Sequence, residues 1–235
     1  MKKVFVTAMM IGATASLASV AFAQTTVIDD NFESYIDQAA LEAVWTQDTT
    51  NKNVTLQEDP TSGTTPANKY AHVPLGTSVA DPAGRISRDI NIQPTDDAPL
   101  EVSFDIRPGG SALGRSYMQL EAPGTNLVDF GLYNNVAGAG WSARVLGGGA
   151  PGAWSIVGGT RKADEWTNLK VLVKTRSVSF YANGILLATQ ARTNSDFPAF
   201  TKVELGFSGG GSAVTTDYDN LLVRVVAAVN DWNLY

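Results

Sequence analysis

The sequence predicts an all-β protein, folded as a two-sheet antiparallel β-sandwich with one short N-terminal helix. The first observation behind this prediction is the alternation of apolar and polar residues, clearest over residues 100–107, as in a strand with one buried face. The second is the turn pair Asn183-Gly184 between two β-rich runs, because a type I′ hairpin needs positive φ at both positions. The third is the regular spacing of many short strands between glycine- and proline-rich turns.

The N-terminal segment, residues 1–23, is interpreted as a signal peptide. Two lysines open it, an apolar alanine-rich run follows, and residues 21–23 (Ala-Phe-Ala) form a small-x-small cleavage site. We therefore expect a secreted protein, extracellular or periplasmic. Residues 24–228 are expected to form one domain, since an all-β chain of this size need not split, and residues 229–235 a C-terminal tail.

The composition excludes several kinds of partner and chemistry. The formal net charge is −6, which is the wrong sign for nucleic-acid phosphates and for anionic lipid surfaces. The chain has no cysteine and a single histidine, His72, so we expect no disulfide, no zinc or copper site and no histidine-based catalytic triad. After signal cleavage no apolar run is long enough to span a membrane.

The helix and the strands follow in order along the mature chain. Asp37 is a good N-cap for the helix, and Ile36, Ala40 and Val44 lie on one of its sides. Trp45, directly after the helix, is expected to plug one end of the sandwich. The strands are predicted over residues 26–32, 54–56, 70–75, 85–92, 100–107, 117–120, 127–133, 142–146, 153–157, 166–173, 178–181, 185–188, 202–207 and 215–226.

Three of these strands form an antiparallel meander around residues 164–190. Trp166 opens the first strand, and the aromatic pair Phe180-Tyr181 precedes the turn at Asn183-Gly184. Together these residues resemble the motif of the laminin-G-like, concanavalin A-like jelly-roll family. Residues 29–35 (DDNFESY) and 217–223 (DYDNLLV) resemble the opening and closing strands of its secreted bacterial members.

The resemblance implies a jelly-roll sandwich over most of the mature chain, with Trp166 in the core at the start of the central strand. The two terminal strands are expected to pair side by side and close the fold. The resemblance does not select an activity, because this architecture hosts many unrelated ones.

A glycine-rich segment in the middle of the chain holds two tryptophans, Trp141 and Trp154. Exposed aromatic rings stack on the C–H faces of sugars, and neighbouring glycines let a flat surface approach the backbone. Tyr133, Asn135 and Arg144 lie nearby in the sequence. These five residues are the candidate site of a non-enzymatic carbohydrate-binding module whose partner is an extracellular glycan. The alternative for either tryptophan, a ring that fills the end of a sheet, stays open.

Three aspartates of the terminal strands are candidate metal ligands. Asp30 is in phase with Ile28, which should point inward, and Asp217 and Asp219 are in phase with Leu221. Buried carboxylates require compensation, and a structural calcium ion supplies it by taking oxygen ligands. Hydrogen bonds from backbone amides of neighbouring loops are the alternative.

Two other functions remain open. One is a structural or surface-assembly protein without a small ligand. The other is a glycan hydrolase of the concanavalin A-like fold, which needs a pair of carboxylates. Glu101 and Asp105 share one strand face, but their spacing departs from the Glu-x-Asp-x-Glu pattern of laminarinase-type glucanases and a third acid is missing. A solvated strand face is the simpler interpretation.

Overall fold

The computed structural model describes residues 24–47, 53–59, 68–75, 84–206 and 213–227. The predicted signal peptide and C-terminal tail lie outside these residues. Within the described part of the chain, no helix is both long enough and apolar enough to cross a membrane.

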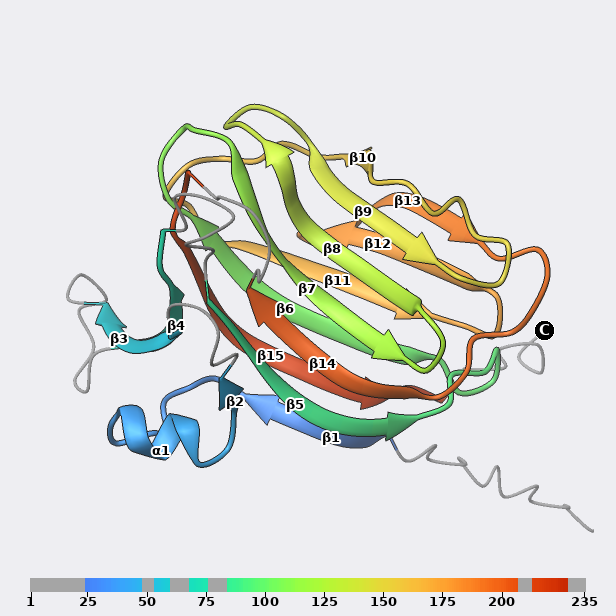
Figure 1. The fold of residues 1–235 in the computed structure, drawn as a ribbon, viewed down its shortest axis with the longest axis horizontal. Helices are drawn as coiled ribbons and strands as arrows, with labels where there is room; N and C mark the ends of the chain where they lie inside the picture. Colours follow the sequence, from blue (N-terminus) through green and yellow to red (C-terminus); the bar gives the residue numbers. More distant parts are fainter. Residues whose placement is uncertain (1–23, 48–52, 60–67, 76–83, 207–212, 228–235) are drawn as a thin grey trace, which may run out of the picture.

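One sheet has eight strands within the described residues, all paired antiparallel (Figure 1). The last strand, β15, lies in its interior and pairs with β6, with β4 and with the first strand, β1. The pairing of the terminal strands predicted from the sequence is therefore confirmed. In sheet order the strands are β13 (Ile185–Ala191), β12 (Ser177–Ala182), β11 (Thr167–Val173), β6 (Leu100–Pro108), β15 (Thr216–Val225), β4 (Asn68–Val73) and β3 (Thr55–Asp59), with β1 (Thr25–Asp30) beside β15.

The second sheet has seven strands within the same residues, also antiparallel. Strand β14 is inserted between β7 and β5, as β15 is inserted in the other sheet. In sheet order the strands are β10 (Ser155–Gly158), β9 (Trp141–Leu146), β8 (Asn126–Asn135), β7 (Gly114–Ala122), β14 (Phe200–Gly206), β5 (Arg85–Ile92) and β2 (Thr46–Gln47).

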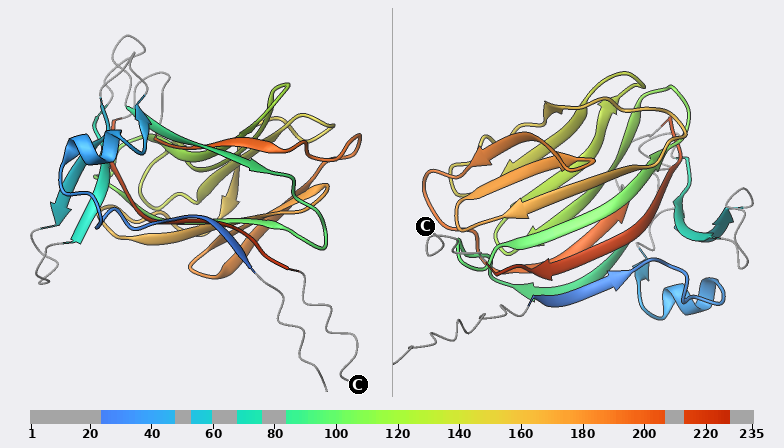
Figure 2. Two further views of the ribbon diagram at one scale, coloured as in Figure 1. Left: turned by 90° about the horizontal axis from the view of Figure 1, so that it is seen from below. Right: turned by 180° about the vertical axis from the view of Figure 1, so that it is seen from behind.

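The two sheets form separate layers that pack face to face (Figure 2). In the central strands alternate residues point into the space between the sheets, as Phe104 and Ile106 do on β6. Across that space Phe130 of one sheet contacts Phe180 of the other, with ring centroids 5.1 Å apart. The predicted antiparallel β-sandwich is confirmed. It forms because the alternating sequence pattern gives each sheet one apolar face to bury.

The predicted helix is confirmed as α1 (Gln38–Glu42), and the carboxylate of Asp37 caps it by accepting a hydrogen bond from the Ala40 amide. The side that carries Ile36, Ala40 and Val44 does not enter the core, because Ile36 is 84% exposed and Leu41 is the helix residue that is fully buried. A single helical turn has room for only one inward position. Trp45 is buried beside it, as predicted.

The orientation predicted for two aspartates of the last strand is also wrong. Asn220 has a φ of 50°, and the register of β15 against β6 shifts between Asp219 and Leu222. This bulge changes which residues face inward, so that Tyr218 and Leu221 enter the core. Asp217 therefore lies on the outer face of the eight-stranded sheet, where it binds Arg107.

Trp166 is not a core residue, contrary to the expectation drawn from the family motif. Its ring is half-buried and meets the edge of Tyr70 at 6.0 Å between centroids. The guanidinium carbon of Arg107 lies 4.8 Å from the centroid of Trp166 and 4.9 Å from that of Tyr70. The ring of Trp166 covers a charged side chain on the outer face of the sheet and does not enter the core.

Candidate functional site

The outer face of the seven-stranded sheet carries a row of polar side chains on adjacent strands. Glu204 is in register with Gln119, Gln119 with Asp129, and Asp129 with Arg144. Gln119 donates to Asp129 Oδ1 at 2.6 Å, and Arg144 Nε donates to Asp129 Oδ2 at 2.6 Å. At the other end of the row, Arg85 donates to Glu204 at 2.7 Å. The neighbouring residues along each strand face the core, which places this row outside.

The carboxylates of this row are covered, while their arginine partners reach solvent. The side chains of Asp129 and Glu204 are 0% and 3% exposed, whereas those of Arg144 and Arg85 are 22% and 29% exposed. Burial raises the pKa of the Asp129 carboxyl, and the charge of Arg144 acts in the opposite direction. The guanidinium groups of this row are therefore partly accessible from solvent, whereas its carboxylates are not.

An aromatic group lies beside this row and includes one of its arginines. The ring of Trp154 stacks on that of Tyr133, with centroids 4.3 Å apart and planes 2° apart, and lies 4.9 Å from the ring of Tyr117. The guanidinium carbon of Arg144 lies over Trp154, 4.9 Å from its centroid. We call Tyr117, Tyr133, Arg144 and Trp154 the Trp154 cluster. It combines aromatic surface with hydrogen-bond donors, as sugar-binding sites do.

Two glycines near the Trp154 cluster are required by close packing. Gly131 pairs with Tyr117 on the sheet, and a Cβ at Gly131 would lie 2.7 Å from the carbonyl oxygen of Ser116. Gly148, in the loop that leads to Trp154, has a φ of +56°, and a Cβ there would lie 2.0 Å from the Arg192 guanidinium. A side chain at either position would clash with its neighbour, so both glycines serve close packing, Gly131 against strand β7 and Gly148 against Arg192.

Three of the five residues predicted for a ligand site come together here, namely Tyr133, Arg144 and Trp154. Asn135 does not present its amide to a ligand, because its side chain is buried and bridges the Tyr133 amide, the Gly140 carbonyl and the Ser142 hydroxyl. Tyr117, Gln119 and Asp129 were not predicted from the sequence, because they are not adjacent to the tryptophans in the chain. Their alternation with core residues on two predicted strands was the available signal.

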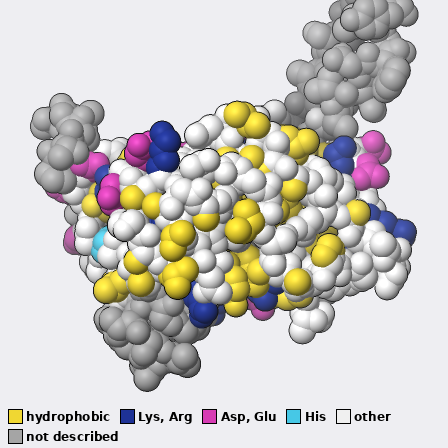
Figure 3. Space-filling model, turned by 90° about the horizontal axis from the view of Figure 1, so that it is seen from above, with side chains coloured by type: hydrophobic (Ala, Val, Ile, Leu, Met, Phe, Trp, Pro, Cys, Tyr) yellow, Lys and Arg dark blue, Asp and Glu magenta, His cyan; other side chains and the backbone are white. Residues whose placement is uncertain are grey.

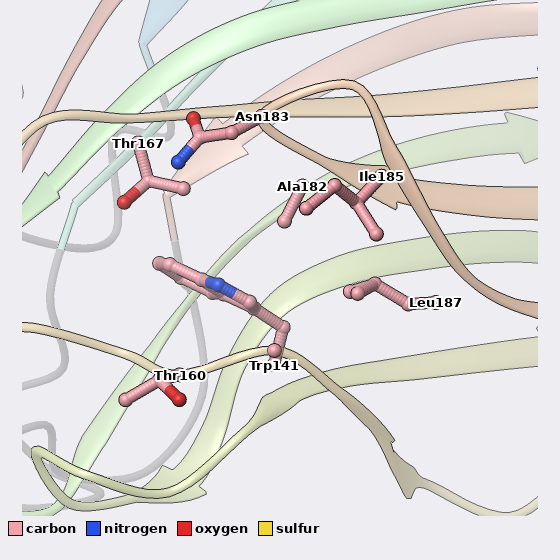
Figure 4. Close-up of a pocket in the computed structure, with 8 residues that line it drawn as sticks. Trp141, Thr160, Thr167, Ala182, Asn183, Ile185 and Leu187 are labelled. Carbon is pink, nitrogen blue, oxygen red and sulfur yellow. The ribbon is translucent and has the colours of Figure 1, made fainter.

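Trp141, the second predicted ligand tryptophan, is 1% exposed and lies between the two sheets. Figure 4 shows its ring between Thr160 on one side and Thr167 and Asn183 on the other. The ring borders a cavity of about 300 Å³ that Ile185 and Leu187 also line. Trp141 has no exposed ring face for a sugar, contrary to the prediction, and instead fills the end of the sandwich.

The edge strands beside Trp141, β10 and β13, leave apolar side chains at the surface. Figure 3 views the molecule from this side and shows hydrophobic groups there. Ile156 of β10 and Ile185 and Leu186 of β13 are exposed. Gln190 of β13 donates to Ser155 of β10 at 3.2 Å, which joins the two edges.

The three predicted calcium ligands do not share one site. Asp30 faces inward, as predicted, and accepts hydrogen bonds from the Phe32 amide, the Trp45 indole and the Tyr35 hydroxyl. Asp217 lies on the outer face of the same eight-stranded sheet, where it is held between His72 and Arg107. Among the described residues no group of three acidic, histidine or cysteine side chains is placed to hold a metal ion. Calcium binding stays a prediction, without these aspartates as its shared ligands.

The third of these carboxylates, Asp219, accepts hydrogen bonds from the Asn68 side chain and the Asn220 amide. Burial raises its pKa to about 6, with smaller upward contributions from Asp105 and Glu33. A raised pKa means that the folded protein binds this proton more tightly than the unfolded chain does. This carboxyl group therefore lowers stability as pH rises from about 4 to about 6.

Asp219→Asn is expected to remove this loss of stability with rising pH, because the amide does not titrate. The free energy of unfolding of the variant, minus that of the natural protein, should increase between pH 4 and pH 7 in urea titrations. Asp29→Asn, an exposed substitution on β1, is the control and should show no such increase. A difference that stays constant or falls with pH for Asp219→Asn would contradict the raised pKa.

The carboxylates suggested for a hydrolase lie on one face, as predicted, but that face belongs to the eight-stranded sheet. Glu101 is bound by Arg224 at 2.6 and 2.8 Å, and Lys170 lies 3.7 Å away. Asp105 accepts hydrogen bonds from Asn168 and Asn220, both at 2.8 Å. Each carboxylate is engaged, and the Trp154 cluster is on the other sheet, so these two acids do not contribute to the candidate site.

Comparison with known proteins gives likeness in structure alone. No family model and no curated protein matches the sequence. A sialidase has a TM-score of 0.58 and 11% identity over 86% of this chain, which spans only 18% of the sialidase. A Bacillus licheniformis β-glucanase has a TM-score of 0.54 and 12% identity, over 87% of this chain and 98% of its own.

A third similar structure is domain 4 of AbnA, a GH43 extracellular arabinanase from Geobacillus stearothermophilus, in complex with arabinotriose. Its TM-score is 0.55 and its identity 15%, over 87% of this chain and 94% of that domain. At this level of identity the likeness establishes the fold. The chain is a jelly-roll β-sandwich.

Proposed function

We propose that this protein is a secreted, laminin-G-like module that binds a carbohydrate without cleaving it, at the Trp154 cluster. The observation that carries the proposal is the placement of a half-exposed tryptophan over the sheet, beside two tyrosines and an arginine. Sugars bind to such surfaces because their C–H groups pack on the rings while their hydroxyls meet polar groups nearby.

The buried carboxylates support binding over cleavage. Glycoside cleavage needs two carboxyl groups that reach the scissile bond. In the polar row beside the Trp154 cluster, Asp129 and Glu204 are both covered and each is paired with an arginine. Such groups shape and stiffen a binding surface, because their hydrogen bonds fix the side chains above them.

The test is glycan binding by two tryptophan variants of the mature protein. A glycan array first identifies a bound glycan, and titration calorimetry then measures its affinity. Trp154→Ala is expected to weaken binding by about 1–3 kcal/mol, the range found when aromatic rings that stack on nucleobases are removed. Trp166→Ala is the matched control, since this ring is also half-buried but lies on the outer face of the other sheet.

Equal loss of affinity in both variants would place the glycan away from the Trp154 cluster. Failure of the natural protein to bind any glycan on the array would reject the carbohydrate proposal. It would favour the alternative of a structural or surface-assembly protein.

A further inference from the structure

The guanidinium of Arg144 is held in place through its Nε, while its two terminal nitrogens are unused by the described residues. Its Nε donates to Asp129, and its guanidinium lies over Trp154, so both the position and the plane of the group are restrained. Within the described residues, neither terminal nitrogen of Arg144 has a hydrogen-bond acceptor. These nitrogens are also absent from the buried polar atoms that lack a partner, so they reach solvent. A restrained guanidinium with two free N–H groups is preorganised for a planar bidentate acceptor.

Two neighbouring donors, the Tyr133 hydroxyl and the Trp154 indole N–H, also lack a hydrogen-bond partner among the described residues. In the described part of the chain no residue forms a hydrogen bond with the Tyr133 hydroxyl or accepts one from the Trp154 indole N–H. Neither atom is sealed from solvent. Because Trp154 contacts both Tyr133 and Arg144, the three unused donor groups belong to side chains that touch one another.

The charges around these donors favour an anion. Both oxygens of Asp129 already accept hydrogen bonds, one from Gln119 and one from Arg144, and the carboxylate has no exposed surface. A second guanidinium, that of Arg115, lies 5.3 Å from the centroid of Tyr133. A ligand at the Trp154 cluster therefore meets positive groups, although the protein as a whole carries a formal charge of −6.

We propose that the glycan bound at the Trp154 cluster is acidic and carries uronate carboxylates. One carboxylate accepts two hydrogen bonds from the terminal nitrogens of Arg144, while the sugar ring lies beside the exposed aromatic surface. This inference rests on the proposed function and adds the chemical class of the ligand. A planar carboxylate matches the spacing of the two guanidinium nitrogens, which an uncharged hydroxyl does not.

The direct test compares two glycans that differ in one group. Oligogalacturonate and its carboxyl-reduced form have the same linkages, but reduction converts each carboxylate to a neutral hydroxymethyl group. The natural protein should bind the acidic form at least tenfold more tightly. Raising the salt concentration from 50 mM to 500 mM should narrow that difference, because ion pairs at the surface are screened. A sulfated galactan, whose negative charge comes from sulfate esters and not from carboxylates, serves as a third ligand. Preferential binding to it would overturn the carboxylate assignment.

Two matched variants locate the carboxylate. Arg144→Lys keeps a positive charge near Asp129 but loses the planar pair of donors, so its affinity for oligogalacturonate should fall to that for the reduced form. Arg224→Lys is the control, because Arg224 is also partly exposed and paired with a covered carboxylate, Glu101, on the other sheet. It should bind oligogalacturonate as the natural protein does. The comparison of the two glycans uses the natural protein alone, so it stands even if Arg144→Lys folds poorly.

Equal affinity for the acidic and the reduced glycan would overturn this inference and leave the carbohydrate proposal intact. Unchanged acidic binding by folded Arg144→Lys would overturn the role of Arg144. Absence of binding to both glycans, together with binding to a neutral glycan on the array, would reject only the acidic class. Absence of all glycan binding would reject the proposed function as well.

Discussion

Trp141→Ala is expected to lower the free energy of unfolding by about 3–5 kcal/mol, the usual cost of emptying a buried aromatic site. The indole is 1% exposed and lies where β9 of one sheet faces β11 and β12 of the other. A cavity of about 300 Å³ already borders the ring, so its removal would enlarge a region that is incompletely packed. The surrounding strands are fixed by their ladders and cannot close the gap.

Urea denaturation of the two tryptophan variants measures this effect. Trp154→Ala serves as the comparison, because its ring is half-exposed and its removal should cost clearly less stability. If Trp141→Ala loses less than about 1 kcal/mol, well under the range for buried aromatic residues, the ring does not support the sandwich. Similar losses for both variants would mean that Trp154 is also a packing residue.

Asp30→Ala should produce the second large loss, about 3 kcal/mol or more. The carboxylate accepts hydrogen bonds from the Phe32 amide at 2.9 Å, the Trp45 indole at 2.9 Å and the Tyr35 hydroxyl at 2.5 Å. Its removal leaves these three buried donors without their acceptor, and each unsatisfied buried group costs about 1–3 kcal/mol. Arg88, whose guanidinium lies 3.5 Å from the same carboxylate, loses its partner as well. The three buried donors hold the chain that links β1 to α1, so the end of the sandwich should loosen as a unit.

The matched control is Asp29→Ala, one position earlier on the same strand, where the side chain is exposed. It should change the free energy of unfolding by less than about 0.5 kcal/mol, as is usual for surface substitutions. Asp30→Asn should fall between the two alanine variants, because the amide keeps one acceptor oxygen. Equal stability of the two alanine variants in urea denaturation would contradict the bridging role of Asp30.

The sequence predicted the sheets well because burial on one face imposes a two-residue period on every strand. The same two-residue period could have predicted that Trp141 points inward, since Trp141, Ala143 and Val145 alternate along one strand and all three are buried. The strand predicted from the sequence began at Ser142, one residue too late to include Trp141 in this alternation. Trp154 lies outside any strand, so no period applies to it, and its position depends on the fold of a glycine-rich loop.

The two-residue period does not predict which residues of neighbouring strands lie side by side. Gln119 and Asp129 meet because the hairpin between β7 and β8 sets their register, and its turn uses positive φ at both Gly124 and Thr125. A threonine in that conformation is uncommon and gives no clear signal in a sequence. The bulge at Asn220 is a similar case. One residue with positive φ reversed the predicted facing of Asp217, although every flanking residue looks like ordinary strand.

The insertion of β14 and β15 into the interiors of the two sheets has a consequence for how the chain folds. Both strands come from the C-terminal part of the chain, and β15 must pair with β1 at the opposite end. Synthesis proceeds from the N-terminus, so these strands emerge last. Until they arrive, β7 and β5 have no neighbour between them, nor have β6 and β4, and unpaired strand edges invite aggregation. Closing such long loops is slow. The chain is therefore expected to complete the seven-stranded sheet only after β14 has been made, and the eight-stranded sheet only after β15 has been made.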